Sequence, residues 1–139
     1  MDPPYLAANQ PLIDVAELAL VRGFDDNVRA RLRPYITALP VFTTVNVNTA
    51  PAEVLAAVID GLDLGGAQLL VAQRDRAYYR DRDDFLRRLP RGMEAAANDV
   101  GVSSNYFMAT LRVTIGGAQA RGKALLARQG SRWPAIVWR

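Results

Sequence analysis

Apolar positions in the first part of the chain follow the spacing of short helices. Asp14 and Glu17 have the spacing of a capping box, which predicts a helix over 15–22 that ends at Gly23. Apolar residues then recur at helical intervals over 27–33, between an aspartate pair and a proline. The first 33 residues are therefore expected to contain two short helices joined by a glycine turn.

The segment 45–55, VNVNTAPAEVL, changes from an alternating pattern to a helical one. Its first two valines alternate with asparagines, as in a short strand. Asn48 or Thr49 is expected to cap the third helix, and Pro51 lies in its first turn, where a missing N–H costs nothing. The inward stripe predicted for this helix is Val54, Leu55, Val58 and Ile59.

Glycines at 61, 65 and 66 predict a long turn over 61–66, followed by a fourth helix over 66–76. Residues 78–82 are interpreted as a polar link. A short fifth helix follows around Phe85, and residues 93–98 are expected to add one more turn. The inward residues expected in these helices are Ala67, Leu70, Val71, Phe85, Leu86 and Leu89.

After Val102 the period of the pattern changes from helical to two. Gly116-Gly117 predicts a tight hairpin between strands over 106–115 and 118–128, with Gly122 expected at a bulge or close contact. A turn over 130–134 leads to a third strand, 135–139. One face of the first strand carries Phe107, Ala109, Leu111, Val113 and Ile115.

These elements place the chain in the α+β class. The predicted organisation is a helical domain over 1–101, containing a helix-hairpin-helix or SAM-like unit, and a three-stranded antiparallel sheet over 102–139. With 139 residues, the chain is long enough for two small domains.

Composition narrows the chemistry that the chain can perform. It has no cysteine and no histidine, which excludes thiolate catalysis, disulfides, Cys-type zinc sites and imidazole bases. The 17 basic residues exceed the 14 acidic ones only slightly, and the two kinds alternate along 80–84. The basic pI of 9.7 therefore indicates a solvated surface rather than a nucleic-acid partner.

Carboxylates and serines are the remaining candidates for catalysis. The acidic residues lie next to each other at predicted helix starts, so helix capping explains them better than paired-carboxylate hydrolysis does. Ser103 and Ser104 have no visible base, and we predict no catalytic residues and no enzyme activity. The acidic candidates are Asp25, Asp26, Asp81, Asp83 and Asp84.

The helical hairpin over 45–76 is similar to a helix-hairpin-helix module, which offers the backbone N–H groups of its turn to phosphate. The expected turn is longer than the compact form, and Asp63 lies where a phosphate would bind. A carboxylate at this position repels phosphate. A packing unit is favoured, and a DNA-binding module stays the alternative function.

Several motifs in order resemble one family, protein K of the general (type II) secretion pathway, the large minor pseudopilin. The resemblance covers essentially the whole chain, and the order of its motifs is more specific than the NVNTAP segment alone. The residues that carry it are Tyr5–Leu12, Asp14, Glu17, Leu18, Leu32–Tyr35, Val45–Leu55, Arg74 and Val102–Phe107.

The resemblance implies a pilin-like fold with a large helical insertion, and residues 1–101 would be the C-terminal part of that insertion. It implies a structural role at the tip of a pseudopilus, with minor pseudopilins I and J as partners. It also implies a location at the periplasmic face of the inner membrane of a Gram-negative bacterium. No nucleic acid is expected as a partner.

The family's N-terminal membrane helix is absent from this sequence, so Met1 is interpreted as a truncation point and membrane anchoring is expected only through that missing helix. Family members bind calcium, but the resemblance assigns no calcium ligands to residues of this chain, and no cofactor is expected to be required. The isolated chain is expected to be sticky or marginally stable, because the apolar strand face lacks the helix that would cover it.

Overall fold

The computed structural model describes residues 10–96, 98–128, 130 and 133–138. Contacts divide the chain into two units, Met1–Phe42 and Thr43–Arg139, and each is described by itself. Arg139, with which the predicted third strand ends, lies outside the described residues. The domain boundary expected between residues 101 and 102 stays a prediction.

The first helical segment of the first unit is η1, Val15–Leu20, a 3-10 helix rather than the α-helix predicted over 15–22. The Asp14 carboxylate accepts from the Ala16 N–H at 2.7 Å, and Glu17 reaches back to the N–H of Ile13 at 2.8 Å. Asp14 therefore caps the segment as predicted. No residue of η1 is buried, so packing does not draw it into α geometry.

The second helix of this unit is α1, Asp26–Leu32, which confirms the helix predicted over 27–33. Its N-cap is Asp25, whose carboxylate accepts from the Val28 N–H at 2.8 Å. Val28 and Leu32 are half-buried. None of the described residues 10–42 is fully buried, so this unit has no closed core among them.

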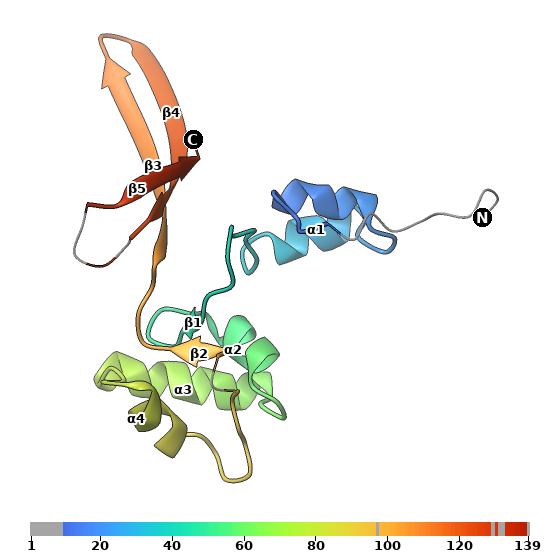
Figure 1. Ribbon diagram of the computed structural model, residues 1–139, viewed down its shortest axis with the longest axis vertical. Helices are drawn as coiled ribbons and strands as arrows, with labels where there is room; N and C mark the ends of the chain where they lie inside the picture. The colour runs from blue at the N-terminus through green and yellow to red at the C-terminus, as the bar shows by residue number, and fades with distance from the viewer. Residues whose placement is uncertain (1–9, 97, 129, 131–132, 139) are drawn as a thin grey trace, which may run out of the picture. The chain divides into compact units, whose positions relative to one another are not determined.

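A helical cluster begins the second unit (Figure 1). Its buried core is continuous and includes both aromatic and aliphatic side chains, and a large aliphatic side chain or a phenylalanine contributes about 1.5–3 kcal/mol when fully buried. Its helices are α2 (Ala52–Val58), α3 (Leu64–Arg76) and α4 (Arg82–Arg87). The core residues are Val47, Ala50, Leu55, Ile59, Leu62, Ala67, Leu70, Tyr79, Phe85 and Val100.

Two helix starts differ from the prediction. Pro51 is the N-cap of α2 without a side-chain hydrogen bond, so neither Asn48 nor Thr49 caps this helix. Asn48 instead bonds the backbone of Tyr79, as described below. α3 begins at Leu64, two residues early, because Asp63 supplies its cap. The extra helical turn expected over 93–98 is not formed at its start, since Glu94 pairs with Asp60 in an isolated β-bridge, and Ala97 lies outside the described residues.

Two very short strands close the helical cluster, β1 (Val45–Asn46) and β2 (Val100–Gly101). They pair in parallel, with Val45 opposite Val100. The N–H of Val45 donates to Asp99 O at 2.8 Å, and that of Val47 donates to Gly101 O at 2.9 Å. A Cβ on Gly101 would lie 2.7 Å from Thr44 Oγ1, so glycine is required for this approach.

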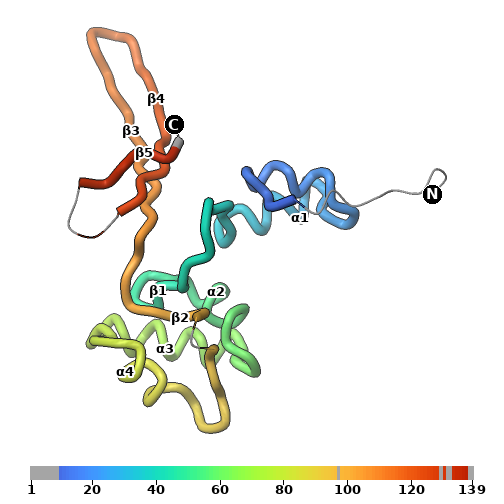
Figure 2. Tube along the Cα trace, viewed as in Figure 1, coloured from blue at the N-terminus to red at the C-terminus, as the bar shows by residue number. Residues whose placement is uncertain are grey.

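The remaining strands form an antiparallel sheet in the order β3-β4-β5, which confirms the predicted topology. They are β3 (Tyr106–Ile115), β4 (Ala118–Ala127) and β5 (Ala135–Trp138). Figure 2 shows the long β3–β4 hairpin and its tight turn. Gly116 has φ +57°, which a type II′ turn requires at its first central position.

The sheet has a β-bulge, but it does not lie at Gly122, where the sequence predicted a bulge or close contact. Gly122 pairs in regular register with Leu111, and a Cβ built on it meets nothing within 4 Å. The register shift lies between Leu125 and Leu126, where β4 pairs with β5. The bulge therefore adjusts the short third strand and leaves the hairpin regular.

Candidate functional site

The turn between α2 and α3 is shorter than predicted. It spans only the residues from Ile59 to Asp63, with Gly61 at φ +76° and Leu62 buried in the core. Asp63 Oδ1 accepts from the N–H of Gly66 at 2.7 Å. The carboxylate thus occupies the N-terminus of α3, where a helix-hairpin-helix protein would hold a phosphate.

Two asparagines shape the loop before α2. Asn46 Oδ1 accepts from the N–H of Asn48 at 3.0 Å, and its Nδ2 donates to Ser104 Oγ at 3.0 Å. Asn48 makes a reciprocal pair with the backbone of Tyr79: its Nδ2 donates to the carbonyl at 2.9 Å, and its Oδ1 accepts from the N–H at 2.8 Å. Each asparagine therefore replaces a backbone partner that the loop lacks.

Arg74, on the last turn of α3, connects this loop to the helix. Its guanidinium donates to the carbonyl of Val47 at 2.8 Å and to that of Ala50. The side chain is only 12% exposed. Arg74 satisfies two carbonyls just before α2, a helix whose N-cap makes no side-chain hydrogen bond.

Tyr79 contradicts the polar link predicted over 78–82, because it is 1% exposed and belongs to the core. Its hydroxyl donates to Leu70 O at 2.8 Å, and its ring packs edge-on against Phe85 with centroids 4.9 Å apart. The Arg88 guanidinium lies 5.1 Å from the ring centre. Burial raises the pKa of the Tyr79 hydroxyl, although Arg88 and Arg74 oppose this shift.

The Asp84 carboxylate accepts hydrogen bonds from two neighbouring arginines. The N–H of Arg80 donates to its carboxylate at 3.1 Å, and Arg88 approaches the same group at 2.9 Å. The Arg80 N–H and the Arg88 guanidinium lower the pKa of the Asp84 carboxyl. Asp84 is therefore an ionised partner for Arg88 and has no free proton to transfer near neutral pH.

The other acidic candidates have structural partners or lie on the surface. Asp81 caps α4 by accepting from the Asp84 N–H at 2.7 Å, and Asp26 pairs with Arg29. Asp83 is exposed. Ser104 accepts from Asn46, as described above. Within the described residues, these groups do not assemble into a nucleophile and base pair.

The same carboxylates are the candidate ligands for a metal ion. Among the residues that the structure describes, no group of three or more Asp or Glu side chains is placed to hold an ion. These carboxylates therefore do not fit a calcium centre of the usual kind, which needs six to eight oxygen ligands.

The described helices include none that is long and apolar enough to cross a membrane.

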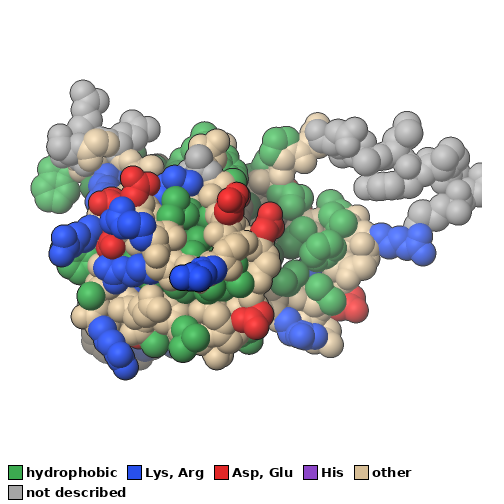
Figure 3. Space-filling model, turned by 90° about the horizontal axis from the view of Figure 1, so that it is seen from below, with side chains coloured by type: hydrophobic (Ala, Val, Ile, Leu, Met, Phe, Trp, Pro, Cys, Tyr) green, Lys and Arg blue, Asp and Glu red, His purple; other side chains and the backbone are tan. Residues whose placement is uncertain are grey.

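The surface of the chain contains two kinds of region. Figure 3 shows acidic and basic side chains lying next to each other on the face seen from below. The sheet differs, because the face carrying Phe107, Leu111 and Val113 is apolar and open. Leu111 is 58% exposed and Ile115 is 76% exposed. The predicted strand face therefore exists and is uncovered by the described part of the chain.

Comparison with known proteins gives one consistent result. A family model described as type II secretion system (T2SS), protein K, matches residues 45–103, and a second model with the same description matches residues 1–41. Together they cover well over half of the chain.

Curated relatives agree with the family models. The protein named type II secretion system protein K of Pseudomonas aeruginosa is 36% identical over 115 residues, which is 82% of this chain and 34% of the relative. The protein of that name in Klebsiella pneumoniae is 39% identical over 136 residues, 92% of this chain and 42% of the relative. The chain thus spans about two fifths of the length of these relatives or less.

A solved structure shares the fold. A chain in the crystal structure of the GspK-GspI-GspJ complex from the type 2 secretion system of enterotoxigenic Escherichia coli superimposes with a TM-score of 0.71. The match has 25% sequence identity and covers 99% of this chain and 51% of that one. The α+β arrangement predicted from the sequence is thereby confirmed.

Proposed function

The chain belongs to the protein K family of the type II secretion system, and from this premise we propose that it is part of a minor pseudopilin. In this role it is a structural subunit at the tip of the pseudopilus, where it supports assembly of the fibre and export of proteins across the outer membrane. The observation that carries the proposal is the match of 99% of the chain to a chain in a three-protein secretion complex.

The partners that we propose are the minor pseudopilins I and J of the same system, by analogy with the complex solved from Escherichia coli. The proposed location is the periplasmic face of the inner membrane, reached through an N-terminal membrane helix of the longer protein. The chain acts by presenting surfaces and performs no reaction. This agrees with the acidic side chains described above, which act as caps and ion-pair partners.

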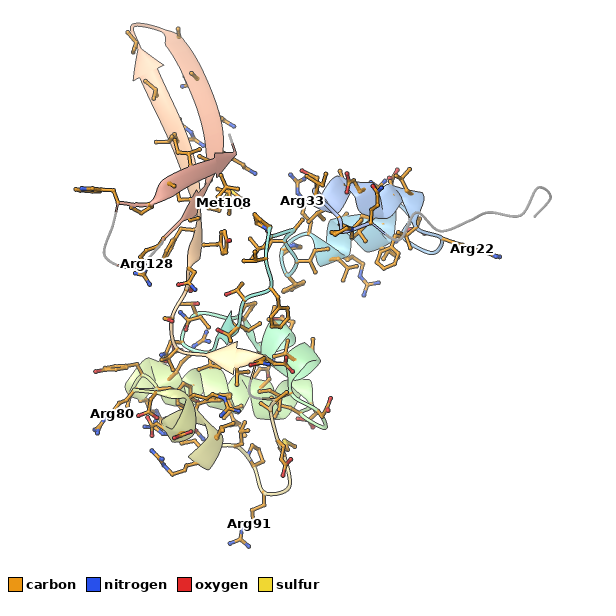
Figure 4. The ribbon with its side chains drawn as sticks, viewed as in Figure 1. Arg22, Arg33, Arg80, Arg91, Met108 and Arg128 are labelled. Carbon is orange, nitrogen blue, oxygen red and sulfur yellow. The ribbon has the colours of Figure 1, made fainter. Side chains whose placement is uncertain are left out.

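Co-purification of the full-length protein with tagged pseudopilins I and J tests this role. We expect both partners to be recovered with the protein, and secretion to be lost in a strain that lacks it. A matched variant, Arg80→Ala with Arg91→Ala, removes two side chains that project outward from the helical cluster and should retain both properties (Figure 4). A full-length protein that recovers neither partner contradicts the proposal.

DNA binding, the alternative function, loses its main contact in the structure. Asp63 fills the helix N-terminus that phosphate would use, and its charge repels phosphate. A gel shift with duplex DNA at about 20 mM salt, where electrostatic binding is strongest, checks this point. Retarded DNA that is released by salt would restore the alternative.

Calcium binding remains a proposal for the longer family protein, with ligands outside the carboxylates described above. Because a ligand that binds only the folded state raises the melting temperature, millimolar calcium provides a simple assay. We expect the melting temperature of this chain to be the same in calcium chloride and in EDTA. A rise in calcium would show that the chain contains a site of its own.

A further inference from the structure

The charge of the chain is divided unevenly along the sequence. Residues 100–139 contain six basic residues and no Asp or Glu, whereas residues 1–99 contain 11 basic and 14 acidic residues. The sheet is built from the acid-free part. Its cations therefore have no acidic neighbour along their own strands.

Three of these cations lie on one face of the β3–β4 hairpin. Arg112 is directly opposite Arg121, and Lys123 is opposite Thr110, two residues from Arg112 along β3. Directly opposite residues share a face, as do residues two apart on a strand. The three side chains are exposed, and their Cβ atoms lie roughly 5–8 Å apart in such a register.

This arrangement is unfavourable for the isolated hairpin. Like charges placed directly opposite each other on a sheet are destabilising. In the described part of the chain, no ion pair involves Arg112, Arg121 or Lys123. The contrast is Arg88, which is matched by Asp84 on its own helix turn. The hairpin keeps a cluster of cations that its own fold does not neutralise.

The surroundings of the cluster indicate what neutralises it. Its neighbours on the same face are Thr110, Thr114 and Gln119, which offer hydrogen bonds. The apolar residues beside the cluster, Leu111, Val113 and Ile115, point to the opposite face. Met108 and Leu125 share the cationic face but lie at its far end, and Leu125 is buried, so the cluster itself lacks the apolar rim that membrane insertion requires. Among the described side chains of the hairpin, Tyr106 is the aromatic on this face, and it lies four residues along β3 from Thr110, away from the arginines, so base stacking beside them is not provided. A folded acidic surface needs only matched charge and hydrogen bonds.

We propose that the face of the hairpin carrying Arg112, Arg121 and Lys123 binds an acidic surface of a partner protein, one that presents two or more neighbouring carboxylates. Each guanidinium can take a carboxylate in a two-point contact, and the lysine adds a point charge. This proposal goes beyond the secretion role, because it needs only the hairpin and an acidic partner.

A labelled peptide of ten glutamates serves as the probe, with a ten-glutamine peptide as its neutral match. Fluorescence polarisation at about 20 mM salt measures binding, because screening is weak there. We expect the glutamate peptide to bind the chain, and Arg112→Thr with Arg121→Thr to weaken that binding roughly tenfold. The matched control, Arg80→Thr with Arg91→Thr, removes the same charge elsewhere and should change affinity less than about twofold.

A stability measurement separates lost binding from lost structure. Removing one of two opposed arginines relieves repulsion, and threonine suits a strand, so Arg121→Thr should melt at or above the temperature of the parent. Equal loss of peptide binding in the test and control pairs would overturn the proposal, because binding would then follow net charge alone.

A membrane assay completes the design. Vesicles of phosphatidylethanolamine and phosphatidylglycerol, mixed at about 7:3, offer anionic headgroups instead of carboxylates. We expect the chain not to sediment with them. Vesicle binding that depends on Arg112 and Arg121, without peptide binding, would assign the face to lipid and overturn the proposal.

Discussion

The helical cluster between Val45 and Gly101 and the sheet between Tyr106 and Trp138 use their apolar residues differently. The cluster encloses large side chains completely, including Tyr79 and Phe85 at 1% and 0% exposure. The sheet has an equally clear apolar pattern but leaves most of its β3 side chains open. A regular pattern thus predicts which residues share a face, whereas burial depends on whether another element covers that face.

The largest expected effect compares one leucine from each region. Leu55→Ala empties a site that is 0% exposed and should lower the free energy of unfolding by about 2–5 kcal/mol. Leu111→Ala removes a side chain that is 58% exposed and should cost less than about 1 kcal/mol. Urea denaturation of both variants measures the difference. Equal losses would show that the sheet face is packed in solution.

Arg74 provides the next test, because it connects α3 to the loop before α2. Arg74→Ala leaves the carbonyls of Val47 and Ala50 without this donor and should destabilise the chain by about 2–3 kcal/mol. Arg74→Lys should recover only part of that loss, since an ammonium lacks the planar fork. The exposed neighbour Arg76 is the control, and its alanine variant should unfold at the parent's urea midpoint.

Tyr79 tests the core through its hydroxyl. Tyr79→Phe removes the bond to Leu70 O and should cost about 1 kcal/mol at neutral pH. The pKa of Tyr79 is raised in the folded chain, so above pH ~10 the unfolded state loses this proton first and stability falls as pH rises. The phenylalanine variant should lack that part of the alkaline loss. If the free energy of unfolding fell equally with rising pH in the parent and in Tyr79→Phe, the Tyr79 hydroxyl would not be buried in solution as described.

Asp84 should have a smaller effect on stability than Tyr79, and its contribution is lost at acidic rather than alkaline pH. Its pKa is lowered on folding, so its contribution is present above the ordinary carboxyl value of ~3.9 and is lost as pH falls through the folded value. Asp84→Asn should weaken the chain near neutral pH and flatten its stability curve below about pH 4. Urea midpoints across this range measure both effects. Asp83→Asn, a change at an exposed carboxylate on the same helix, is the matched control for the loss near neutral pH and should cost less than about 0.5 kcal/mol there.

The open apolar face should affect association more than folding. We expect the chain to self-associate at high concentration, as the sequence already predicted, because exposed apolar patches drive contact between molecules. Leu111→Thr with Val113→Thr should increase the monomer fraction in analytical ultracentrifugation. A parent chain that is monodisperse at every concentration would contradict this expectation.

Local signals made the helices and the hairpin predictable. The sequence predicted caps from Asp25 or Asp26 and from Asp81 or Asp83, because a helix cap depends on residues within one turn. The structure selects Asp25 and Asp81. Gly116-Gly117 predicted the β3–β4 turn, since only two residues decide a tight hairpin. Leu55 on α2 and Ile59 at its C-cap, four residues apart, were correctly expected to be buried.

Features that depend on distant residues were missed. Tyr79 stands in a polar run, and its burial follows from Asn48, Leu70 and Phe85, which its neighbours do not reveal. The length of the α2–α3 turn was misjudged because Gly65 and Gly66 suggested a loop, whereas Asp63 starts the helix before them. The segment 45–55 was singled out from the sequence as a helix start and a family motif, but the hydrogen bonds from Arg74 to its carbonyls are seen only in the structure.

The parallel pair of β1 and β2 has a mechanical consequence. It joins residues about fifty-five apart, so the chain enters and leaves the helical cluster at adjacent points. Tension applied to Thr44 and Val102 pulls the two strands along their length and loads their inter-strand hydrogen bonds together, in shear rather than one after the other. A pulling force along the chain would therefore be carried by the β1–β2 pair. The helices between the two strands would bear no load until that pair breaks.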